Sequence, residues 1–368
     1  MSRGRKGFRQ AVLLAACLAL SGCSTLGYYV QAVQGHLEVL RRSEPIAEVV
    51  ARPDTPPALK SRLERVLEIR AFASRELALP DNGSYRSYAD LRRPFVLWNV
   101  FAAPEFSVHP VESCFLFAGC VTYRGFYAEE RARSYADSLG SEGLDTYVGG
   151  VPAYSTLGYF NDPVLNTFVN QPEPEVARLI FHELAHQVAY VSGDSAFNES
   201  FATAVEEAGL GRWLDEQGTP AQREAWRNYQ VRRTAFISLI ERYRQLLDRA
   251  YASGRGGLSD APRLREVKAG LFREMRVDYE ALKRDWGGFA GYDRYFNRDL
   301  NNALLAVVAV YTQWVPAFAR LMQEQRGDMK AFYREVGSLA RLDKAERQKR
   351  LEALLPRGAA PPAPVERG

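Results

Sequence analysis

The spacing of hydrophobic and polar residues divides the chain into helical ends and a β-rich middle. Between residues 26 and about 80 the apolar positions recur at helical spacing, with a break at Pro53, Pro56 and Pro57. From residue 173 to about 355 nearly every stretch again has a helical period. Long amphipathic helices are predicted at about 221–252, 261–285 and 299–325.

The middle of the chain, residues 94–160, has a different pattern. Short runs rich in β-branched and aromatic residues, bounded by Gly and Pro, predict strands. These runs lie at 95–101, 121–127, 145–148 and 153–157, with a helical stretch at 128–139. Together the zones predict one α+β domain over residues 23–357, in which a small sheet lies beside helices.

Two helices follow the β-rich zone. Pro174 suits a first helical turn, where its missing N–H has no helical partner to lose. Apolar residues then repeat at helical spacing to about Val191, and Gly193 is a natural stop. A second helix is predicted from about residue 197 to residue 214.

The N-terminus has the pattern of an export signal. A basic segment at 2–10 precedes an apolar segment at 11–20 that is too short to span a bilayer. The next residues, Leu20-Ser21-Gly22-Cys23, resemble a lipobox, which implies cleavage after residue 22 and acylation of Cys23. Because Ser24 rather than Asp follows, we expect an anchor in the outer membrane of a Gram-negative cell, on the periplasmic face.

The net charge of the chain after residue 22 argues against nucleic acid as a partner. Four of the 48 basic residues lie within residues 1–22, which contain no acidic residue, so the remainder carries 44 basic and 44 acidic residues. A chain without net positive charge has no general attraction for nucleic acid, so we expect no nucleic-acid partner. We expect the proline-containing tail at 358–368 to be disordered.

Two cysteines remain after export, Cys114 and Cys120. Nearby thiols in an oxidising compartment usually pair, so a disulfide is predicted. A metal-binding Cys pair is the alternative, but it would need closer spacing and further Cys partners.

The first of the two central helices contains His182-Glu183-Leu184-Ala185-His186, an HExxH motif. Residues at i and i+4 lie one turn apart on the same helix face, so both imidazoles can reach one metal ion. Zinc binds neutral imidazole well, and Glu183 is placed to take a proton from water activated by zinc. The sequence therefore predicts one Zn²⁺ per chain, with Glu183 as the catalytic base.

A catalytic zinc needs a third protein ligand, and a carboxylate is expected because His36 and His109 lie far upstream. The second helix supplies Asn198-Glu199-Ser200-Phe201-Ala202 and then Glu206. This segment resembles the third-ligand helix of the gluzincin peptidases, the thermolysin-like and aminopeptidase N-like enzymes. The resemblance implies that Glu199 is a zinc ligand and that Glu206 orients a histidine or a substrate amine, with a solvated helix face as the alternative for Glu206.

Nearly the whole mature chain resembles the predicted-aminopeptidase family of Gram-negative lipoproteins. The lipobox, the Cys114/Cys120 segment, the zinc helices and the run from Gly149 to Gly158 carry this resemblance. It implies a zincin-like fold and zinc-dependent hydrolysis of periplasmic peptides or proteins. In zincins an edge strand before the zinc helix commonly pairs with the substrate, so a strand is expected within residues 149–165.

One departure concerns recognition of the substrate amine. The GxMEN strand motif of aminopeptidase N-like enzymes is absent, and Asp162, Glu206 and Glu207 are the alternative amine-binding candidates. A donor for the tetrahedral oxyanion is also needed. The spacing does not choose among the candidates, which are His109, Tyr154, Tyr159, Tyr292 and Tyr311.

The function predicted from the sequence is zinc-dependent aminopeptidase activity. An endopeptidase that cleaves envelope proteins is one alternative, and a free-amine requirement would separate the two. A lipoprotein scaffold or chaperone with structural zinc is another, which the presence of Glu183 opposes because a structural site needs no base. The sequence does not indicate an oligomeric state.

Overall fold

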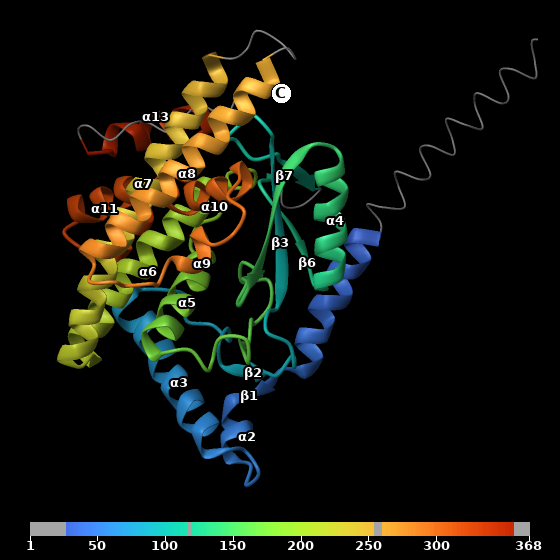
Figure 1. The fold of residues 1–368 in the computed structure, drawn as a ribbon. Coiled ribbons are helices and arrows are strands. Elements are labelled where there is room, and N and C mark those ends of the chain that lie inside the picture. Colours follow the sequence, from blue (N-terminus) through green and yellow to red (C-terminus); the bar gives the residue numbers. More distant parts are fainter. Residues whose placement is uncertain (1–26, 116–118, 254–259, 357–368) are drawn as a thin grey trace, which may run out of the picture.

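The computed structural model describes residues 27–115, 119–253 and 260–356. The expected signal peptide, Cys23 and the tail at 358–368 lie outside this part of the chain. Figure 1 shows a central sheet that separates helix α4 from a larger mass of helices. The fold is α+β, as the sequence predicts.

The central sheet has three antiparallel strands in the order β6-β3-β7. They are β3 (Leu97–Pro104), β6 (Arg124–Phe126) and β7 (Leu144–Val151), and β3 pairs with β7 along its whole length. Alternate side chains of a strand point to opposite faces. Trp98 and Val100 pack against α4 (Glu129–Ser141), whereas Phe101 and Ala103 pack against Ala303 of α10 (Asn302–Thr312).

The N-terminal third is mostly helical. A helix at residues 27–42 is followed by α2 (Ile46–Ala51) and α3 (Pro57–Leu77). A second small sheet, in the order β1-β2-β8, joins this region to the centre of the chain. Its strands are β1 (Glu44–Pro45), β2 (Ser87–Ala89) and β8 (Val164–Leu165).

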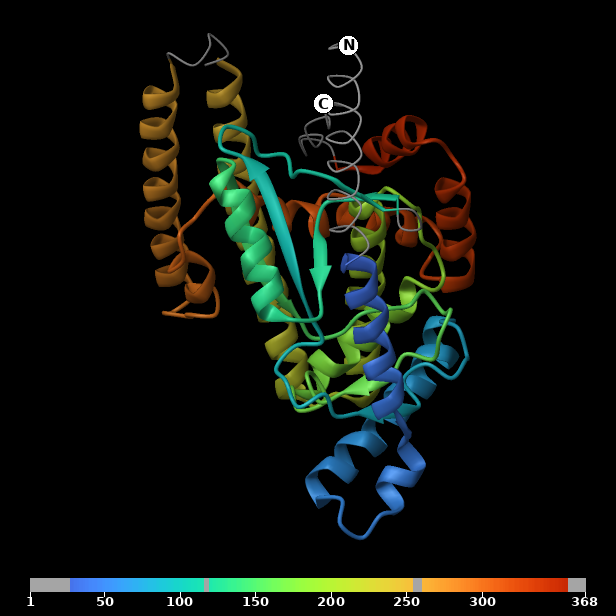
Figure 2. The same ribbon diagram turned by 90° about the vertical axis from the view of Figure 1, so that its right-hand side faces the viewer.

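The C-terminal half contributes helices to two hydrophobic cores. Its helices are α5 (Glu173–Ala185), α6 (Ser195–Gln217), α7 (Pro220–Ser253), α8 (Ala261–Asp285), α9 (Asp293–Phe296), α10 (Asn302–Thr312), α11 (Val315–Glu324), α12 (Met329–Ala340) and α13 (Lys344–Leu354). In the larger core, Phe181 and Phe201 pack with residues of α3, α11 and α12. In the smaller core, α7 and α8 form an antiparallel pair, which projects from one end of the molecule in Figure 2.

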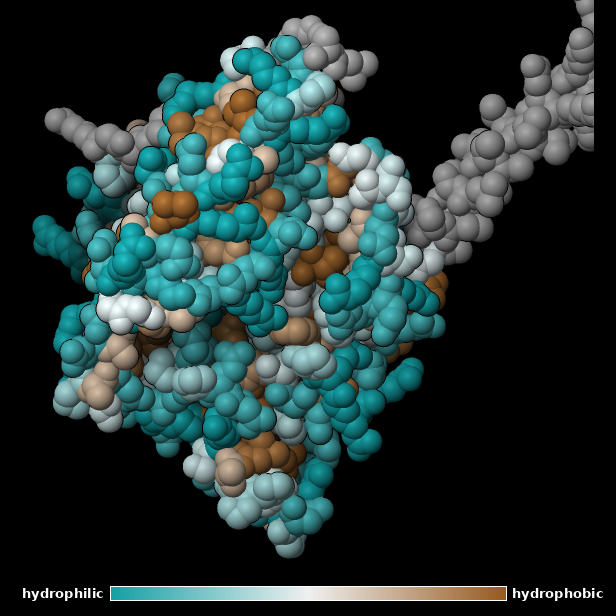
Figure 3. Space-filling view, viewed as in Figure 1, coloured by the Kyte–Doolittle hydropathy of each residue, from teal (hydrophilic) through white to brown (hydrophobic). Residues whose placement is uncertain are grey.

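The segment over α10 and α11 is apolar and long enough to cross a membrane, but half of its most apolar window is buried within the protein. Helix α10 contacts β3 on one side and α6 on the other, so it is a core element. Figure 3 shows a largely hydrophilic surface with separate apolar patches.

Most predicted elements are confirmed, with four corrections. The run at 153–157 is not a strand, because Leu157 and Gly158 both have positive φ angles, 57° and 83°, which turn the chain away from extended geometry. The run at 121–127 is divided between β5 (Gly119–Val121) and β6. The helix predicted at 299–325 is interrupted at residues 313–314, immediately before α11, which starts at Val315 and has Pro316 in its first turn.

The fourth correction concerns the first central helix, which ends at Ala185 rather than at Val191. The residues after His186 form a turn in which Gly193 has a φ of 79°. Within this turn the backbone of Val191 bonds to the Asn198 side chain, which competes with continuation of the helix.

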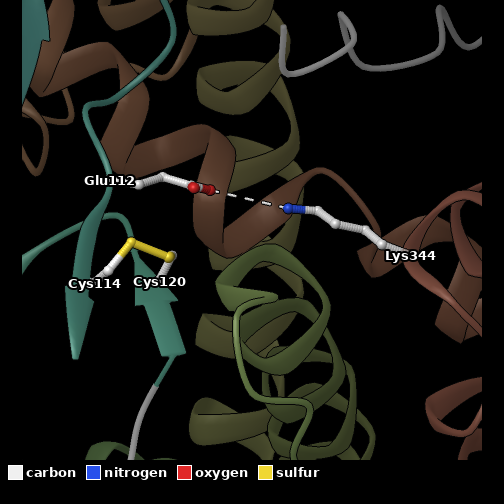
Figure 4. Close-up of a disulfide and its surroundings, with 4 residues drawn as sticks. All are labelled: Glu112, Cys114, Cys120 and Lys344. Atoms are coloured by element: carbon white, nitrogen blue, oxygen red, sulfur yellow. Dashed lines mark ion pairs between the residues drawn. A yellow bond between two sulfur atoms is a disulfide. The ribbon is translucent and has the colours of Figure 1, made fainter. Parts of the chain in front are cut away.

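The predicted disulfide between Cys114 and Cys120 is present and joins β4 (Ser113–Phe115) to β5 (Gly119–Val121), as Figure 4 shows. A salt bridge of 3.9 Å connects Glu112, just before β4, to Lys344 of α13 (Figure 4). On the other side, a Cβ added to Gly119 would lie 2.5 Å from Ser192 Oγ. The hairpin therefore packs against the turn between α5 and α6.

A buried ion pair fixes the start of α6. Asp194 is the N-cap residue and accepts a hydrogen bond from the Phe197 N–H. Its other oxygen lies 2.9 Å from both Nε and Nη2 of Arg347 on α13. Since both side chains are almost fully buried, this pair holds the beginning of α6 against the C-terminal helices.

We expect Arg347→Met to lower the free energy of unfolding by about 3–5 kcal/mol, because the buried Asp194 carboxylate loses its counter-charge. Arg320→Met is the matched control, since Arg320 forms an exposed pair with Glu324 on one helix. Its effect should not exceed about 0.5 kcal/mol. Chemical denaturation of the two variants measures the difference, and equal effects would contradict this role of Arg347.

Candidate metal centre

Helix α5 positions three of the predicted site residues. Its first turn contains Pro174, and its buried face packs into the larger core. His182 and Glu183 lie in the last turn, and His186 is the C-cap residue with φ −59° and ψ −23°, still helical values. The one-turn spacing of the two histidines is therefore kept although the helix ends between them.

The α5–α6 turn brings Glu199 to the same place. Asn198 accepts a hydrogen bond from the Val191 N–H at 2.7 Å and donates one to the Val191 carbonyl at 2.8 Å. This two-way bond closes the short connection and fixes the first turn of α6, where Glu199 follows. The sequence suggested no role for Asn198 beyond its place in the motif.

His182, His186 and Glu199 form a buried group whose ligand atoms all lie within 4.8 Å of one another. Glu199 Oε2 lies 3.3 Å from His182 Nε2 and 3.7 Å from His186 Nε2. Ligands about 2.0–2.2 Å from a tetrahedral metal ion are roughly 3.4 Å apart, so these separations fit one ion. The three side chains could hold a metal ion, and the described residues offer no other such group.

Glu206 and Arg178 form a charged pair behind the candidate ligands. His182 Nδ1 is 2.8 Å from Glu206 Oε2, and because a carboxylate only accepts, Nδ1 donates. Glu206 Oε1 accepts a 2.8 Å bond from Arg178, one turn before His182 on α5. Burial alone would raise the pKa of Glu206, but Arg178 and His182 outweigh it and lower that pKa to about 2.

This chain of bonds determines how His182 can act. With its Nδ1 proton directed at Glu206, His182 presents Nε2 to Glu199 at 3.3 Å, and Nε2 is the atom that would coordinate a metal ion in place of this contact. His186 differs, because its buried Nδ1 has no hydrogen-bond partner among the described residues. The sequence missed Arg178, although its position four residues before His182 on one helix is a signal that could have been used.

The site opens into a cavity of about 440 Å³ between the helix pair and the central sheet. Glu183 lines this cavity with the three candidate ligands. Burial raises the pKa of Glu183, and the two histidines oppose the rise. Much of the remaining wall is aromatic and comes from Tyr28, Tyr29, Phe115, Tyr123, Tyr127, Tyr154, Tyr190 and Tyr311.

The structure separates the oxyanion-donor candidates. Tyr311 lines the cavity, and its ring centroid lies 6.4 Å from that of His182 with nearly parallel planes. Tyr154 also lines the cavity, whereas His109, Tyr159 and Tyr292 do not. Burial raises the pKa of Tyr311 well above its ordinary value, so its hydroxyl stays protonated and can donate. Tyr123 and Tyr190 were not among the candidates, and no local pattern marks them.

None of the three amine-binding candidates lines the cavity. Glu206 is bound to His182 and Arg178, and Glu207 pairs with Arg233. Asp162 is buried, and one of its oxygens accepts a bond from the Thr156 N–H in the loop that replaces the expected strand.

A larger cavity, of about 830 Å³, lies elsewhere along the central sheet. Trp98 lines it, whereas its neighbours Leu97 and Asn99 line the metal-site cavity, as expected for alternate side chains of a strand. Thr146, Tyr147 and Val148 of β7 complete this part of its wall, and none of the three candidate ligands lines it.

Comparison with known proteins identifies the family. The family model described as "Putative aminopeptidase" matches residues 27–351. None of the curated proteins and none of the solved structures matches the chain. The matched region includes α5, α6 and every residue of the candidate metal centre. Since it spans most of the sequence, the chain belongs to the family described as putative aminopeptidases.

Proposed function

We propose that this protein is a zinc-dependent aminopeptidase with a zincin-like site. The observation that carries the proposal is the arrangement of His182, His186 and Glu199 around one point, with Glu183 on the wall of the same cavity. Two imidazoles and one carboxylate are a donor set typical of catalytic zinc, which leaves a further position open. The family description supports peptidase activity.

Zinc bound by these three residues would supply a Lewis acid that polarises the scissile carbonyl and acidifies water. Glu183 then accepts the proton of the attacking water and delivers it to the leaving amine. Its raised pKa suits this exchange, because a base with a pKa closer to neutrality both takes and returns a proton readily. The Tyr311 hydroxyl is the donor that we assign to the developing oxyanion.

The cavity wall supports a preference for apolar substrate side chains. Apart from Glu183, Glu199 and the two histidines, the described residues that line it carry no charged side chain. A peptide carboxylate would therefore find no Arg or Lys on this wall, and a substrate amine no carboxylate other than Glu183 and Glu199. Aromatic and aliphatic side chains would instead pack against the tyrosine rings.

We expect Glu183→Gln to retain zinc and to lose about 10²–10⁴-fold or more in the rate of peptide hydrolysis, because the amide cannot accept the proton of water. Metal content and hydrolysis of free and N-terminally blocked fluorogenic peptides are measured on the parent and the variant. An aminopeptidase cleaves only the free peptides, and loss of that activity in Glu183→Gln supports the mechanism. Cleavage of blocked peptides would point to an endopeptidase. Near-normal activity in the variant would overturn the role of Glu183, and zinc without any hydrolysis would favour a binding protein.

Removal of the bond to His182 should weaken metal binding. We expect Glu206→Ala to reduce zinc affinity by about 10–100-fold, because His182 loses the acceptor that fixes its tautomer and ring orientation. Glu207→Ala is the matched control, since the adjacent carboxylate pairs with Arg233 and does not touch the site. Competition with a chelator of known affinity measures both variants. If the two lose zinc equally, Glu206 has no special role.

We also propose that Cys23 is acylated and anchors the protein to the outer membrane on its periplasmic face. The order Leu20-Ser21-Gly22-Cys23 directly after the apolar segment at 11–20 supports this proposal. Mass spectrometry of the mature N-terminus should show a chain that begins at an acylated Cys23. Cys23→Ala should abolish the modification and release the protein from the membrane fraction, whereas an unmodified Cys23 in the wild-type chain would refute it.

A further inference from the structure

The helix at residues 27–42 exposes an apolar face that the fold does not use. Val30, Val33 and Leu37 are 46%, 58% and 39% exposed and follow one another at helical spacing. Arg41, four residues after Leu37 and also exposed, continues the same face. Other residues of this helix, including Gln31, Gly35 and Val39, are buried against the protein.

The helix is held to the protein through that buried side. Gln31 accepts a hydrogen bond from the Tyr127 N–H at 3.0 Å and donates to the Gly125 carbonyl of β6. His36 lies 2.7 Å from the Tyr154 hydroxyl, and Gly35 lies directly against the ring of Tyr127. The exposed apolar residues are therefore not needed to attach the helix.

A neighbouring loop extends the exposed surface. Phe160 is 49% exposed, and its ring centroid lies 4.6 Å from that of His36. His36 is three residues after Val33, so the loop lies beside the apolar face. Tyr159, next to Phe160, is 84% exposed. We call Val30, Val33, Leu37, Tyr159 and Phe160 the outer apolar surface. It contains half of the exposed large hydrophobic side chains of the described residues, which are otherwise Val111, Tyr190, Val231, Val277 and Phe289.

The position of the tether indicates what covers this surface. Gly27 is the fourth residue after Cys23, and four steps of about 3.5 Å each span at most about 14 Å. With Cys23 acylated as proposed above, the first turn of the helix must lie close to the lipid headgroups. An apolar face flanked by a cation is the composition that binds the boundary between headgroups and acyl chains.

We propose that the outer apolar surface docks onto the phospholipid bilayer and fixes the orientation of the protein on the membrane. This docking rests on the lipid anchor proposed at Cys23, and it does not depend on the peptidase mechanism. The same helix contributes Tyr28, Tyr29 and Ala32 to the wall of the metal-site cavity. Docking would therefore hold that cavity beside the membrane surface.

The test uses the chain from Ser24 onward, which lacks the acyl group but retains every described element. We expect it to co-sediment with vesicles of phosphatidylethanolamine and phosphatidylglycerol. The triple variant Val30→Ser/Val33→Ser/Leu37→Ser should have an affinity for these vesicles that is lower by about tenfold or more, because three apolar contacts with lipid are lost. Val231→Ser/Val277→Ser is the matched control, since these valines are each 67% exposed but lie on α7 and α8. It should bind like the parent.

Two further results would overturn the proposal of membrane docking. Absence of vesicle binding by the parent, or equal binding by the triple variant, would overturn the proposal. A dimer in sedimentation velocity that the triple variant dissolves, without vesicle binding, would show that a second copy covers the surface and would also overturn it. Thermal melting verifies that each variant folds, and Tyr159→Ser/Phe160→Ser provides a second variant that leaves the helix intact. Peptide hydrolysis by the same samples is scored separately, so its failure would count only against the proposed enzyme.

Discussion

The hydrogen bond between His182 and Glu206 is the interaction on which the candidate site depends. It joins α5 to α6 through a buried contact of 2.8 Å, and Arg178 balances the charge of the carboxylate. A buried carboxylate without such partners would be costly, and a histidine without an acceptor could present either nitrogen. The bond thus has two effects: it stabilises the buried Glu206 carboxylate, and it fixes which nitrogen of His182 carries the proton.

Contacts in the turn between α5 and α6 hold the two helices at the spacing that this bond needs. Asn198 closes the turn from one end, and Asp194, held by Arg347, fixes the first turn of α6. Both act through backbone groups, so they set the position of the helix rather than of one side chain. Glu199, one residue after Asn198, then lies beside the two histidines. Polar contacts fix the geometry of the turn, while the apolar faces of α5 and α6 pack in the larger core.

Local sequence signals predicted the parts of the site that depend on helical spacing. His182, Glu183 and His186 follow from one motif on one helix, and their relative positions are as predicted. Glu199 required a resemblance, because nothing within α6 alone shows which carboxylate faces α5. The tyrosines of the cavity come from separate elements, such as Tyr123 near the sheet and Tyr311 on α10, and only the tertiary fold brings them together.

The strand predicted at residues 153–157 is wrong for the same reason, because contacts made only in the tertiary fold decide the local structure. The residues 153–157 are apolar and β-prone, but Leu157 and Gly158 adopt left-handed conformations and Asp162 binds the loop from within. Propensity favoured a strand, and a buried polar contact overrode it. The strand expected within residues 149–165 is therefore limited to the end of β7, an edge strand of the central sheet that stops at Val151, and to the short β8.

The helix at residues 27–42 lies between the metal-site cavity and the outer apolar surface, at which we propose that the protein meets the membrane. Tyr28 and Ala32 form part of the cavity wall, while Val30, Val33 and Leu37 face outward on the same helix. A lipid anchor alone would allow the protein to rotate about a short tether. The proposed second contact, made by the outer apolar surface, would remove most of that freedom. Because the same helix also forms part of the cavity wall, this contact would fix the side of the molecule from which a substrate near the membrane would reach Glu183.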